Sequence, residues 1–279
     1  MTPDLDLSAP ALASPGLPPP LQLLTPVTPQ PNKPLFIFVP GMDGTGRLLQ
    51  TQVPELSQAF DIRCLALSPT NHWSWPQLVE HSLSLLKTAI FHQPRPLVYL
   101  CGESFGACWA LQLAVRAPRL FSHLVLVNPA SSFQRLPWMQ WGASLARGLP
   151  GPLYRFSNLG LIPFLMQSQR VAPAAREALL QAMTSVPAAT ALWRVSLLSQ
   201  FQVGQLPLAQ LTRPTLLIAS EADGLLPSVE EAQRLAQQLP QSQLLTLPHS
   251  GHACLLEEAV SLYQLMTQAG FQPENGTQQ

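Results

Sequence analysis

The sequence is short of charged residues. Only 11% of its 279 residues are Asp, Glu, Lys or Arg, and the formal net charge is zero. Without an excess of either sign, neither nucleic acid nor an anionic membrane surface is an expected electrostatic partner. No apolar run approaches the roughly 18 residues of a membrane span. A cytoplasmic protein without a transmembrane segment is expected, and peripheral association with membranes or lipid bodies stays open.

Cysteine is scarce as well. The four cysteines, Cys64, Cys101, Cys108 and Cys254, show neither metal-ligand spacing nor the spacing of a disulfide framework. Buried free thiols and no bound metal are therefore expected. No nucleotide cofactor is expected either, because the glycine-rich segment at residues 40–46 is not followed by the Gly-Lys-Ser/Thr of a phosphate-binding loop.

Proline, by contrast, is abundant near the start. Residues 1–34 hold a third of the 30 prolines and little hydrophobic periodicity, which predicts a disordered, proline-rich tail. Asp4 and Asp6 stand where a signal peptide would be positively charged, so no signal peptide is expected. Residues 271–279 are predicted to be a second flexible tail.

Between these tails, strand and helix patterns alternate. Apolar strand patterns occur at residues 35–39, 62–67, 97–101, 123–127, 215–219 and 243–247, and the main helical ones at 47–60, 75–92 and 107–115. Such alternation predicts an α/β fold with a mostly parallel, doubly wound sheet. Residues 131–211 interrupt it with a long, proline-punctuated helical region. We interpret this region as a cap inserted between two parts of one core, residues 35–130 and 212–270.

The most informative motif is the G-E-S-F-G sequence centred on Ser104. It follows the predicted strand at 97–101 and precedes the predicted helix at 107–115. This is the context of a nucleophile elbow, in which a serine lies at a sharp strand-to-helix turn. Glycines two residues before and after the serine let the chain fold back without side-chain clashes. Ser104 is therefore the predicted nucleophile.

A nucleophilic serine needs a base and an orienting acid, which follow it in the order acid, then histidine, in this kind of site. Asp223 follows the predicted strand at 215–219, and His252 follows the strand at 243–247. Loops at the carboxyl ends of neighbouring parallel strands meet at one edge of a sheet. His252 is thus the predicted base, and Asp223 is predicted to fix its tautomer.

Each partner has a competitor nearby. Glu221 lies closer to its strand than Asp223 does, and we interpret it as a solvated loop charge. His249 precedes His252, and we interpret it as a turn residue, because Gly251 lets the loop bring the second histidine close to the serine.

The oxyanion formed during acyl transfer needs two backbone N–H donors. One is predicted to be Phe105, directly after the nucleophile. The other is expected from the loop at residues 40–46, P-G-M-D-G-T-G, where Met42 is the first choice and Asp43 the alternative. The same segment also fits a glycine-rich turn before the helix at 47–60, and the two interpretations are compatible.

The predicted cap contains many large apolar side chains. Most are expected to pack the cap onto the core. Their number nevertheless favours a pocket for a long acyl or prenyl chain, with Trp138 and Trp141 as candidate substrate-binding residues.

Several motifs resemble those of one family. The motifs that carry the resemblance are LFIFVPGMDGTG at 35–46, GESFGAC at 102–108, NPASSF at 128–133 and SGH at 250–252. Through them, the chain resembles the hydrolase half of the phytyl ester synthase and diacylglycerol acyltransferase family of plants and photosynthetic bacteria. The resemblance covers roughly residues 35–270. It implies an α/β-hydrolase fold and the formation of fatty acid phytyl esters and triacylglycerol. Members usually carry a second, acyltransferase-like domain with a His-x4-Asp motif, which this sequence lacks, so hydrolysis is favoured.

The expected protein is a serine hydrolase, of esterase or lipase type, that cleaves lipophilic carboxylic esters through an acyl-serine intermediate. An acyltransferase that makes phytyl or other fatty acyl esters is the alternative. A non-catalytic, hydrolase-like lipid-binding protein is disfavoured, because such proteins usually lose a member of the triad. The sequence makes no prediction about the oligomeric state.

Overall fold

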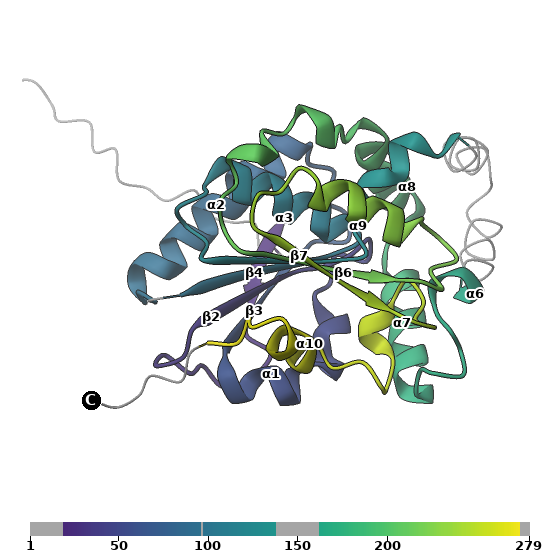
Figure 1. Ribbon diagram of the computed structural model, residues 1–279, viewed down its shortest axis with the longest axis horizontal. Helices are drawn as coiled ribbons and strands as arrows, with labels where there is room; N and C mark the ends of the chain where they lie inside the picture. Colours follow the sequence, from purple (N-terminus) through teal and green to yellow (C-terminus); the bar gives the residue numbers. More distant parts are fainter. Residues whose placement is uncertain (1–18, 96, 138–161, 274–279) are drawn as a thin grey trace, which may run out of the picture.

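A seven-stranded sheet forms the centre of the computed structural model, which describes residues 19–95, 97–137 and 162–273 (Figure 1). The strands are β1 (Leu21–Leu24), β2 (Leu35–Val39), β3 (Asp61–Leu67), β4 (Val98–Glu103), β5 (His123–Val127), β6 (Thr215–Ser220) and β7 (Ser242–Leu247). Their order is β1-β3-β2-β4-β5-β6-β7. Every neighbouring pair is parallel except β1 with β3. The predicted α/β fold with a mostly parallel sheet is confirmed.

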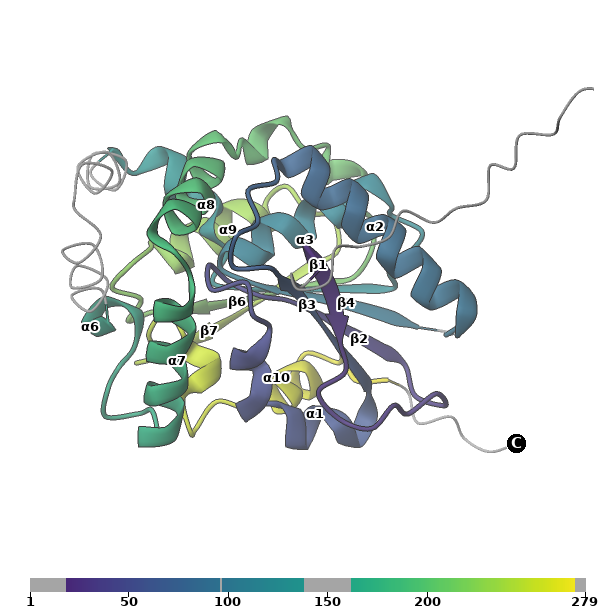
Figure 2. The ribbon, with the colours of Figure 1, turned by 180° about the vertical axis from the view of Figure 1, so that it is seen from behind.

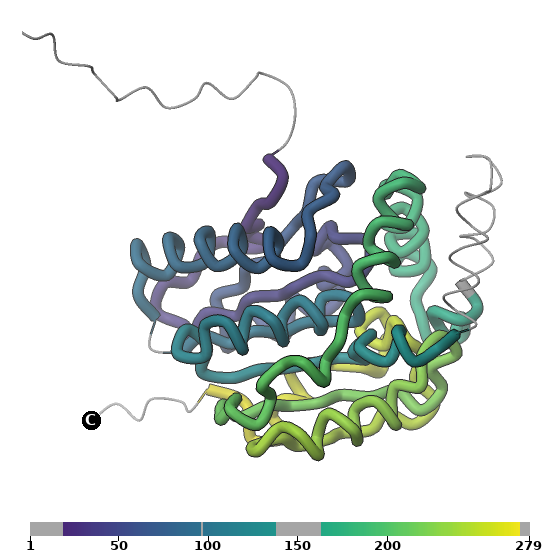
Figure 3. Tube along the Cα trace, turned by 90° about the horizontal axis from the view of Figure 1, so that it is seen from above, coloured from purple at the N-terminus to yellow at the C-terminus, as the bar shows by residue number. Residues whose placement is uncertain are grey.

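Helices cover both faces of this sheet. They are α1 (Val53–Ala59), α2 (Trp75–His92), α3 (Phe105–Arg116), α6 (Ile162–Leu165), α7 (Pro173–Ser185), α8 (Ala188–Gln200), α9 (Ser228–Ala236) and α10 (Leu262–Gln268). Short 3-10 helices are η1 (Arg47–Thr51), η2 (Ala130–Arg135), η3 (Val203–Gln205), η4 (Leu208–Gln210) and η5 (Cys254–Leu256). Helices α2, α3 and α9 lie on one face, where α2 and α3 run side by side, and α1 and α10 lie on the other (Figures 1 and 3).

The alternation of side chains along β2 shows why both faces must be covered. Leu35, Ile37 and Val39 belong to the core that includes α2, α3 and α9, whereas Phe36 and Phe38 belong to the core that includes α1 and α10. Successive residues of a strand point to opposite faces. A strand that is apolar at every position therefore requires a helical layer on each side.

The helix predicted at residues 47–60 is divided into η1 and α1. Pro54 stands in the first turn of α1, and its ring and missing N–H prevent one continuous helix from running through this point. Gln52 occupies the break, and its side-chain amide donates to the carbonyl oxygens of Leu255 at 2.7 Å and Val260 at 2.9 Å. The hydrogen bonds of Gln52 thus connect this part of the chain to the segment after β7.

The described residues of the insertion between β5 and β6 form helices joined by loops, in agreement with the helical character predicted for residues 131–211. The insertion includes α6, α7 and α8, which lie at one end of the molecule (Figure 2). Helix α8 packs on η2, and α7 packs on η1. Its large apolar side chains Phe133, Met166 and Phe201 are buried in packed clusters. Trp138 and Trp141 lie outside the described residues.

The prediction of a disordered segment at residues 1–34 was wrong for its second half. Strand β1 pairs antiparallel with β3, and Leu23 lies opposite Leu65. Farther along, the backbone N–H of Gln30 donates to Asp61 Oδ1 at 3.0 Å. The high average proline content concealed a short leucine-rich run that can pair with the edge of the sheet. The predicted tail at 271–279 also begins too early, because Phe271 is buried in the core.

Deleting residues 1–30 should therefore destabilise the protein. The deletion removes the whole β1–β3 ladder and the apolar contacts of Leu21 and Leu23 with the core. We expect a fall in Tm of at least about 5 °C, equivalent to more than about 1 kcal/mol for a domain of this size. Thermal unfolding followed by circular dichroism measures it. Deletion of residues 1–18, which removes none of these contacts, is the control; equal Tm values for the two deletions would contradict a stabilising role for β1.

Candidate active site

Ser104 lies at a strained turn between β4 and α3. Its backbone has φ 54° and ψ −116°, a region that side chains rarely adopt and that surrounding structure must enforce. The two flanking glycines are required by space. A Cβ at Gly102 would lie 2.4 Å from the carbonyl oxygen of Gly106, and a Cβ at Gly106 would lie 2.1 Å from that of Val39. The G-E-S-F-G segment thus forms the predicted elbow.

Three predicted side chains form one hydrogen-bonded series at the carboxyl edge of the sheet. His252 Nε2 is 2.8 Å from Ser104 Oγ, and His252 Nδ1 is 2.7 Å from Asp223 Oδ2. The His252 and Asp223 side chains are 5% and 1% exposed. Ser104 follows β4, Asp223 follows β6 and His252 follows β7, and the order of these strands in the sheet brings the three loops together.

Asp223 is held by donors on both carboxylate oxygens. The backbone N–H groups of Leu225 and Leu226 donate to Oδ1 at 2.8 and 2.9 Å, and the Ser228 hydroxyl donates to Oδ2. Burial alone would raise the pKa of Asp223, but the charge of His252 and these hydrogen bonds outweigh burial and lower it. Asp223 is therefore an anion that can orient the imidazole.

The environment of His252 favours its protonated form. Burial would lower the pKa of His252, but the charge and hydrogen bond of Asp223 and the more modest effect of Glu103 together raise it above its ordinary value. An imidazole stabilised as a cation in this way can take a proton from Ser104 and hold it next to a developing negative charge.

The two competitors do not enter this series. Glu221 is exposed and its backbone N–H donates to the carbonyl of Leu247 at 3.1 Å. His249 is exposed and has φ 68°, the conformation of a turn residue. The structure thus brings Asp223 and His252, and neither Glu221 nor His249, to Ser104.

Two buried polar residues for which the sequence predicted no role hold the His252 loop. Asn128, at the end of β5, donates through Nδ2 to the carbonyl oxygen of His252 at 2.7 Å and accepts from the N–H of Ser220 at 2.8 Å. Glu257 accepts from the N–H of Gly251 at 2.8 Å and forms an ion pair with Arg170. Asn128 also has φ 43°. The sequence signals for Asn128 are its position directly after a predicted strand and its place at the start of the NPASSF motif.

The loop at residues 40–46 lies against the elbow, as an oxyanion site requires. A Cβ at Gly41 would be 3.8 Å from Ser104 Cβ, which shows how closely the two backbones approach. The loop turns tightly, because the N–H of Gly44 donates to the carbonyl of Gly41 at 3.0 Å. Asp43 closes it by accepting from the N–H of Thr45 at 2.8 Å. Met42, the predicted donor, lies within this turn.

Glu103, directly before the nucleophile, is a buried carboxyl group. Burial raises its pKa to about 7; the charge of Asp43 also raises it and that of His252 lowers it. Its ordinary pKa is 4.5. Between these two values the folded protein binds a proton that the unfolded chain has lost, so Glu103 makes stability fall as pH rises.

Replacing Glu103 with glutamine should remove this loss of stability. Relative to the wild type, the variant should gain little at pH 5 and on the order of 3 kcal/mol by pH 8.5, since each unit of pKa difference corresponds to about 1.4 kcal/mol. Urea unfolding at several pH values measures the difference. Glu80→Gln, at an exposed position of α2, controls for removing a surface charge. A Glu103→Gln advantage that does not grow with pH would contradict the assignment.

The four cysteines and the described metal-ligating side chains are the groups on which a thiol or metal site would depend. All four cysteines are buried and free, and burial raises the pKa of Cys254, close to His252 in sequence, well above its ordinary value. Within the described ranges, no three His, Cys, Asp or Glu residues are grouped so that they could hold a metal ion. None of the helices described is long and apolar enough to cross a membrane.

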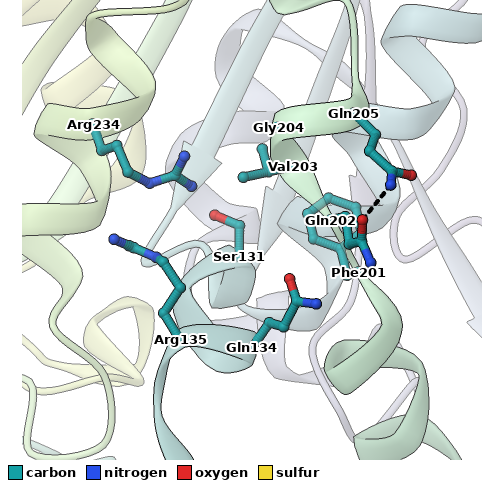
Figure 4. A pocket seen from close by; sticks show the side chains of 9 residues that line it. All are labelled: Ser131, Gln134, Arg135, Phe201, Gln202, Val203, Gly204, Gln205 and Arg234. Atoms are coloured by element: carbon teal, nitrogen blue, oxygen red, sulfur yellow. Dashed lines mark hydrogen bonds between the residues drawn. The ribbon is translucent and has the colours of Figure 1, made fainter.

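Two cavities lie near the candidate site without including Ser104 or His252. One, of about 380 Å³, lies between η2, η3 and the end of α9, and Figure 4 shows the guanidinium groups of Arg135 and Arg234 on the same side of the Ser131 hydroxyl. Both arginines pair with the buried Glu231. The other, of about 360 Å³, lies beside Asp223 and α9. The first is lined mainly by polar side chains, unlike the expected acyl pocket.

Comparison with known proteins places the chain among α/β hydrolases. The sequence model of the serine aminopeptidase S33 family matches residues 31–259. Phytyl ester synthase 1, chloroplastic, of Arabidopsis thaliana is 29% identical over 265 residues, which cover 87% of this chain and 38% of that protein. The pimeloyl-[acyl-carrier protein] methyl ester esterase of Nitrosomonas europaea is 31% identical over 227 residues, which cover 77% of this chain and 88% of that protein.

Solved structures agree on the fold. A hydrolase from Oleispira antarctica superposes with a TM-score of 0.72 at 16% identity, covering 89% of this chain and 93% of that one. The enol-lactonase from Burkholderia xenovorans LB400 gives 0.71 at 15% identity, covering 89% and 95%. The resemblance predicted from the motifs is confirmed, although the chain spans less than two fifths of the length of the phytyl ester synthase.

Proposed function

Because the chain belongs to the serine aminopeptidase S33 family of α/β hydrolases, we propose that it is a serine esterase that cleaves lipophilic carboxylic esters through an acyl-Ser104 intermediate. The observation that carries the proposal is the series Ser104–His252–Asp223, with 2.8 and 2.7 Å between successive polar atoms. A serine, an imidazole and a buried carboxylate in this order perform acyl transfer on several unrelated folds.

The proposed reaction has two halves. Ser104 Oγ attacks the ester carbonyl carbon while His252 Nε2 takes its proton, which gives a tetrahedral oxyanion. When the oxyanion collapses, the bond to the alcohol breaks and His252 protonates the departing alcohol. Water then attacks the acyl-serine, His252 takes a proton from it and returns it to Ser104, and the carboxylic acid leaves. Asp223 holds the imidazole in the tautomer that each step needs.

The oxyanion is proposed to be held by the backbone N–H groups of Phe105 and Met42. Phe105 opens α3, so its N–H points out of the first turn, where the helix dipole favours negative charge. Met42 is supported by the close approach of its loop to Ser104. Asp43 stays the alternative donor. Such donors act without reorganisation because the backbone fixes them before the reaction begins.

Lipophilic substrates are supported by the composition of the insertion and by two relatives whose names refer to a phytyl ester and to a pimeloyl methyl ester. Most of the described large apolar residues of the insertion pack in buried clusters, whereas Phe164 is 52% exposed. Trp138 and Trp141, which lie outside the described residues, are the proposed substrate-binding residues. The dependence of kcat/KM on acyl length tests the proposed preference for lipophilic substrates.

Acyl transfer to an alcohol is the second candidate. It is favoured by the similarity to phytyl ester synthase over 87% of this chain. The chemistry differs only in the second half, where an alcohol instead of water attacks the acyl-serine. Exclusion of water from the acyl-enzyme would decide between the two.

A product analysis tests both candidates. The protein is incubated with p-nitrophenyl esters of C2 to C12 acids, with and without a long-chain alcohol, and the products are separated by mass spectrometry. We expect free acid as the main product and kcat/KM that rises from C2 to C8 by tens-fold or more, because each buried methylene contributes up to about 0.8 kcal/mol. A preference for acetate would contradict the lipophilic substrate, and fatty acyl ester as the main product would favour acyl transfer.

Two controls make the result specific. A fluorophosphonate probe should label the wild type and leave Ser104→Ala unlabelled, because the probe reacts with an activated serine. Aminoacyl p-nitroanilides should be poor substrates; efficient cleavage of these amides would replace the esterase proposal with an aminopeptidase.

A further inference from the structure

Arg194 is a buried cation in the inserted helix α8. Its residue is only 1% exposed and is among the largest fully buried side chains. Burial lowers its pKa to about 10, against the opposing effect of the Asp43 charge. The guanidinium is thus still charged at neutral pH. Burying a charge costs several kcal/mol unless partners compensate for the lost water, so the position of Arg194 requires an explanation.

The partners of Arg194 are backbone carbonyls at the carboxyl edge of the sheet. Nη1 donates to the carbonyl oxygen of Met42 at 2.7 Å, and Nη2 approaches that of Ser68 at 3.4 Å. None of the ion pairs between described residues includes Arg194, and its buried Nε has no partner there. The strongest bond of this guanidinium is therefore made to the loop that is proposed to hold the oxyanion.

The loop is shaped around the guanidinium. Gly44 has φ +66°, and a Cβ there would lie 2.7 Å from Arg194 Nη1 and 2.9 Å from Nη2. Any other residue would be strained in its backbone and would also displace the guanidinium. Gly44 therefore permits the contact between α8 and Met42.

Helix α8 is itself firmly anchored next to this loop. Trp193 donates through its indole N–H to the carbonyl of Trp73 at 3.1 Å, and Trp75 donates to the carbonyl of Leu197 at 2.9 Å. The ring of Trp75 stacks on that of Phe105, with centroids 4.9 Å apart. These contacts flank Arg194 along the helix, so its side chain is presented from a fixed support.

We propose that Arg194 is a positioning residue that holds the 40–46 loop in the shape needed to stabilise the oxyanion. Because a peptide group is planar, fixing the Met42 carbonyl fixes the direction of the Asp43 N–H and constrains the Met42 N–H, the two candidate donors. The proposal makes the insertion part of the catalytic apparatus. It rests on the proposed function and names a further residue on which that function depends.

The test compares Arg194→Met with Arg95→Met. Arg95 is a matched control, because its side chain is 4% exposed, pairs with Asp61 at 2.7 Å and lies at the opposite edge of the sheet. Kinetics with p-nitrophenyl butyrate and inhibition by a trifluoromethyl ketone, which forms a tetrahedral adduct, are measured for each variant. Replacing a residue with a merely structural role would lower Tm, but kcat and the affinity for the ketone would not fall together.

We expect Arg194→Met to lower kcat at least about tenfold while KM changes less than threefold, since loss of a single oxyanion donor costs about 10² to 10³ in kcat. Affinity for the ketone should fall by a similar factor. Arg194→Lys, which keeps a charged donor, should recover part of kcat. Arg95→Met should lower Tm and leave kcat within threefold.

Three results would overturn the proposal. The first is a folded Arg194→Met variant that loses less than tenfold in kcat. The second is an Arg194→Met variant in which KM rises and kcat is unchanged. The third is a loss of kcat in Arg95→Met equal to that in Arg194→Met. If Arg194→Met does not fold, Gly44→Ala, which keeps Arg194 but intrudes on it, must show the same loss of kcat and of ketone affinity; normal values would equally overturn it. Failure of the wild type to react with fluorophosphonate would instead refute the proposed function.

Discussion

Replacing Ser104 with alanine should lower esterase turnover by 10³-fold or more without unfolding the protein. The substitution removes the atom that is proposed to form the acyl bond, and triad deletions in other serine enzymes have effects of this size or larger. The change in stability should be modest, because the side chain gives up one hydrogen bond, that to His252, worth about 1 kcal/mol.

Steady-state kinetics on p-nitrophenyl butyrate, with circular dichroism to verify folding, measure the effect. Ser84→Ala, at an exposed position of α2, is the matched control and should behave as the wild type. A well-folded Ser104→Ala protein that keeps more than a tenth of the turnover would eliminate Ser104 as the nucleophile.

Replacing Asp223 with asparagine should lower kcat by about 10³ to 10⁴, because an amide favours the wrong tautomer of the base. Oδ2 of Asp223 faces both His252 Nδ1 and the Ser228 hydroxyl, while Oδ1 accepts two backbone N–H groups. In the variant, Oδ1 keeps the backbone donors, and the amide nitrogen takes the place of Oδ2. It then donates to Nδ1, which moves the imidazole proton to Nε2 and leaves no acceptor for the Ser104 proton.

Glu221→Gln is the matched control for this variant, since Glu221 precedes Asp223 by two residues and is exposed. It should keep kcat within about threefold of the wild type, because a solvated charge at the surface contributes little. The measurement is kcat from pH 6 to 9. A nearly active Asp223→Asn, or a Glu221→Gln variant with the larger loss, would reverse the two assignments and require His252 to be re-examined as the base.

The parts of the site that the sequence predicted are encoded locally. The elbow at Ser104 needs only a strand, two glycines and a helix in succession, and all are adjacent in the chain. Asp223 and His252 follow from chain order, since loops after neighbouring parallel strands must meet at one edge. These signals can be identified without knowledge of long-range packing. In the structure, His252 lies within hydrogen-bonding distance of both Ser104 and Asp223.

The supporting residues depend on contacts between segments far apart in the sequence. Asn128 reaches the His252 loop, and Arg194 reaches Met42, across more than a hundred residues each. Neither belongs to a periodic pattern, and a buried arginine or asparagine looks in sequence like a surface one. Strand β1 is a similar case, because a four-residue edge strand is defined by its partner β3 more than by its own composition.

The sequence by itself determined the order of the strands and helices from β2 onward, the helical character of the insertion, and the chain positions of the proposed nucleophile, acid and base, because periodicity and turn-forming residues are local properties. The tertiary structure alone decided that Glu103 is a buried carboxyl group, that Asn128 holds the His252 loop, and that Arg194 of the insertion contacts the loop at residues 40–46. Burial and hydrogen bonding between distant segments exist only once the sheet has brought its strand ends together.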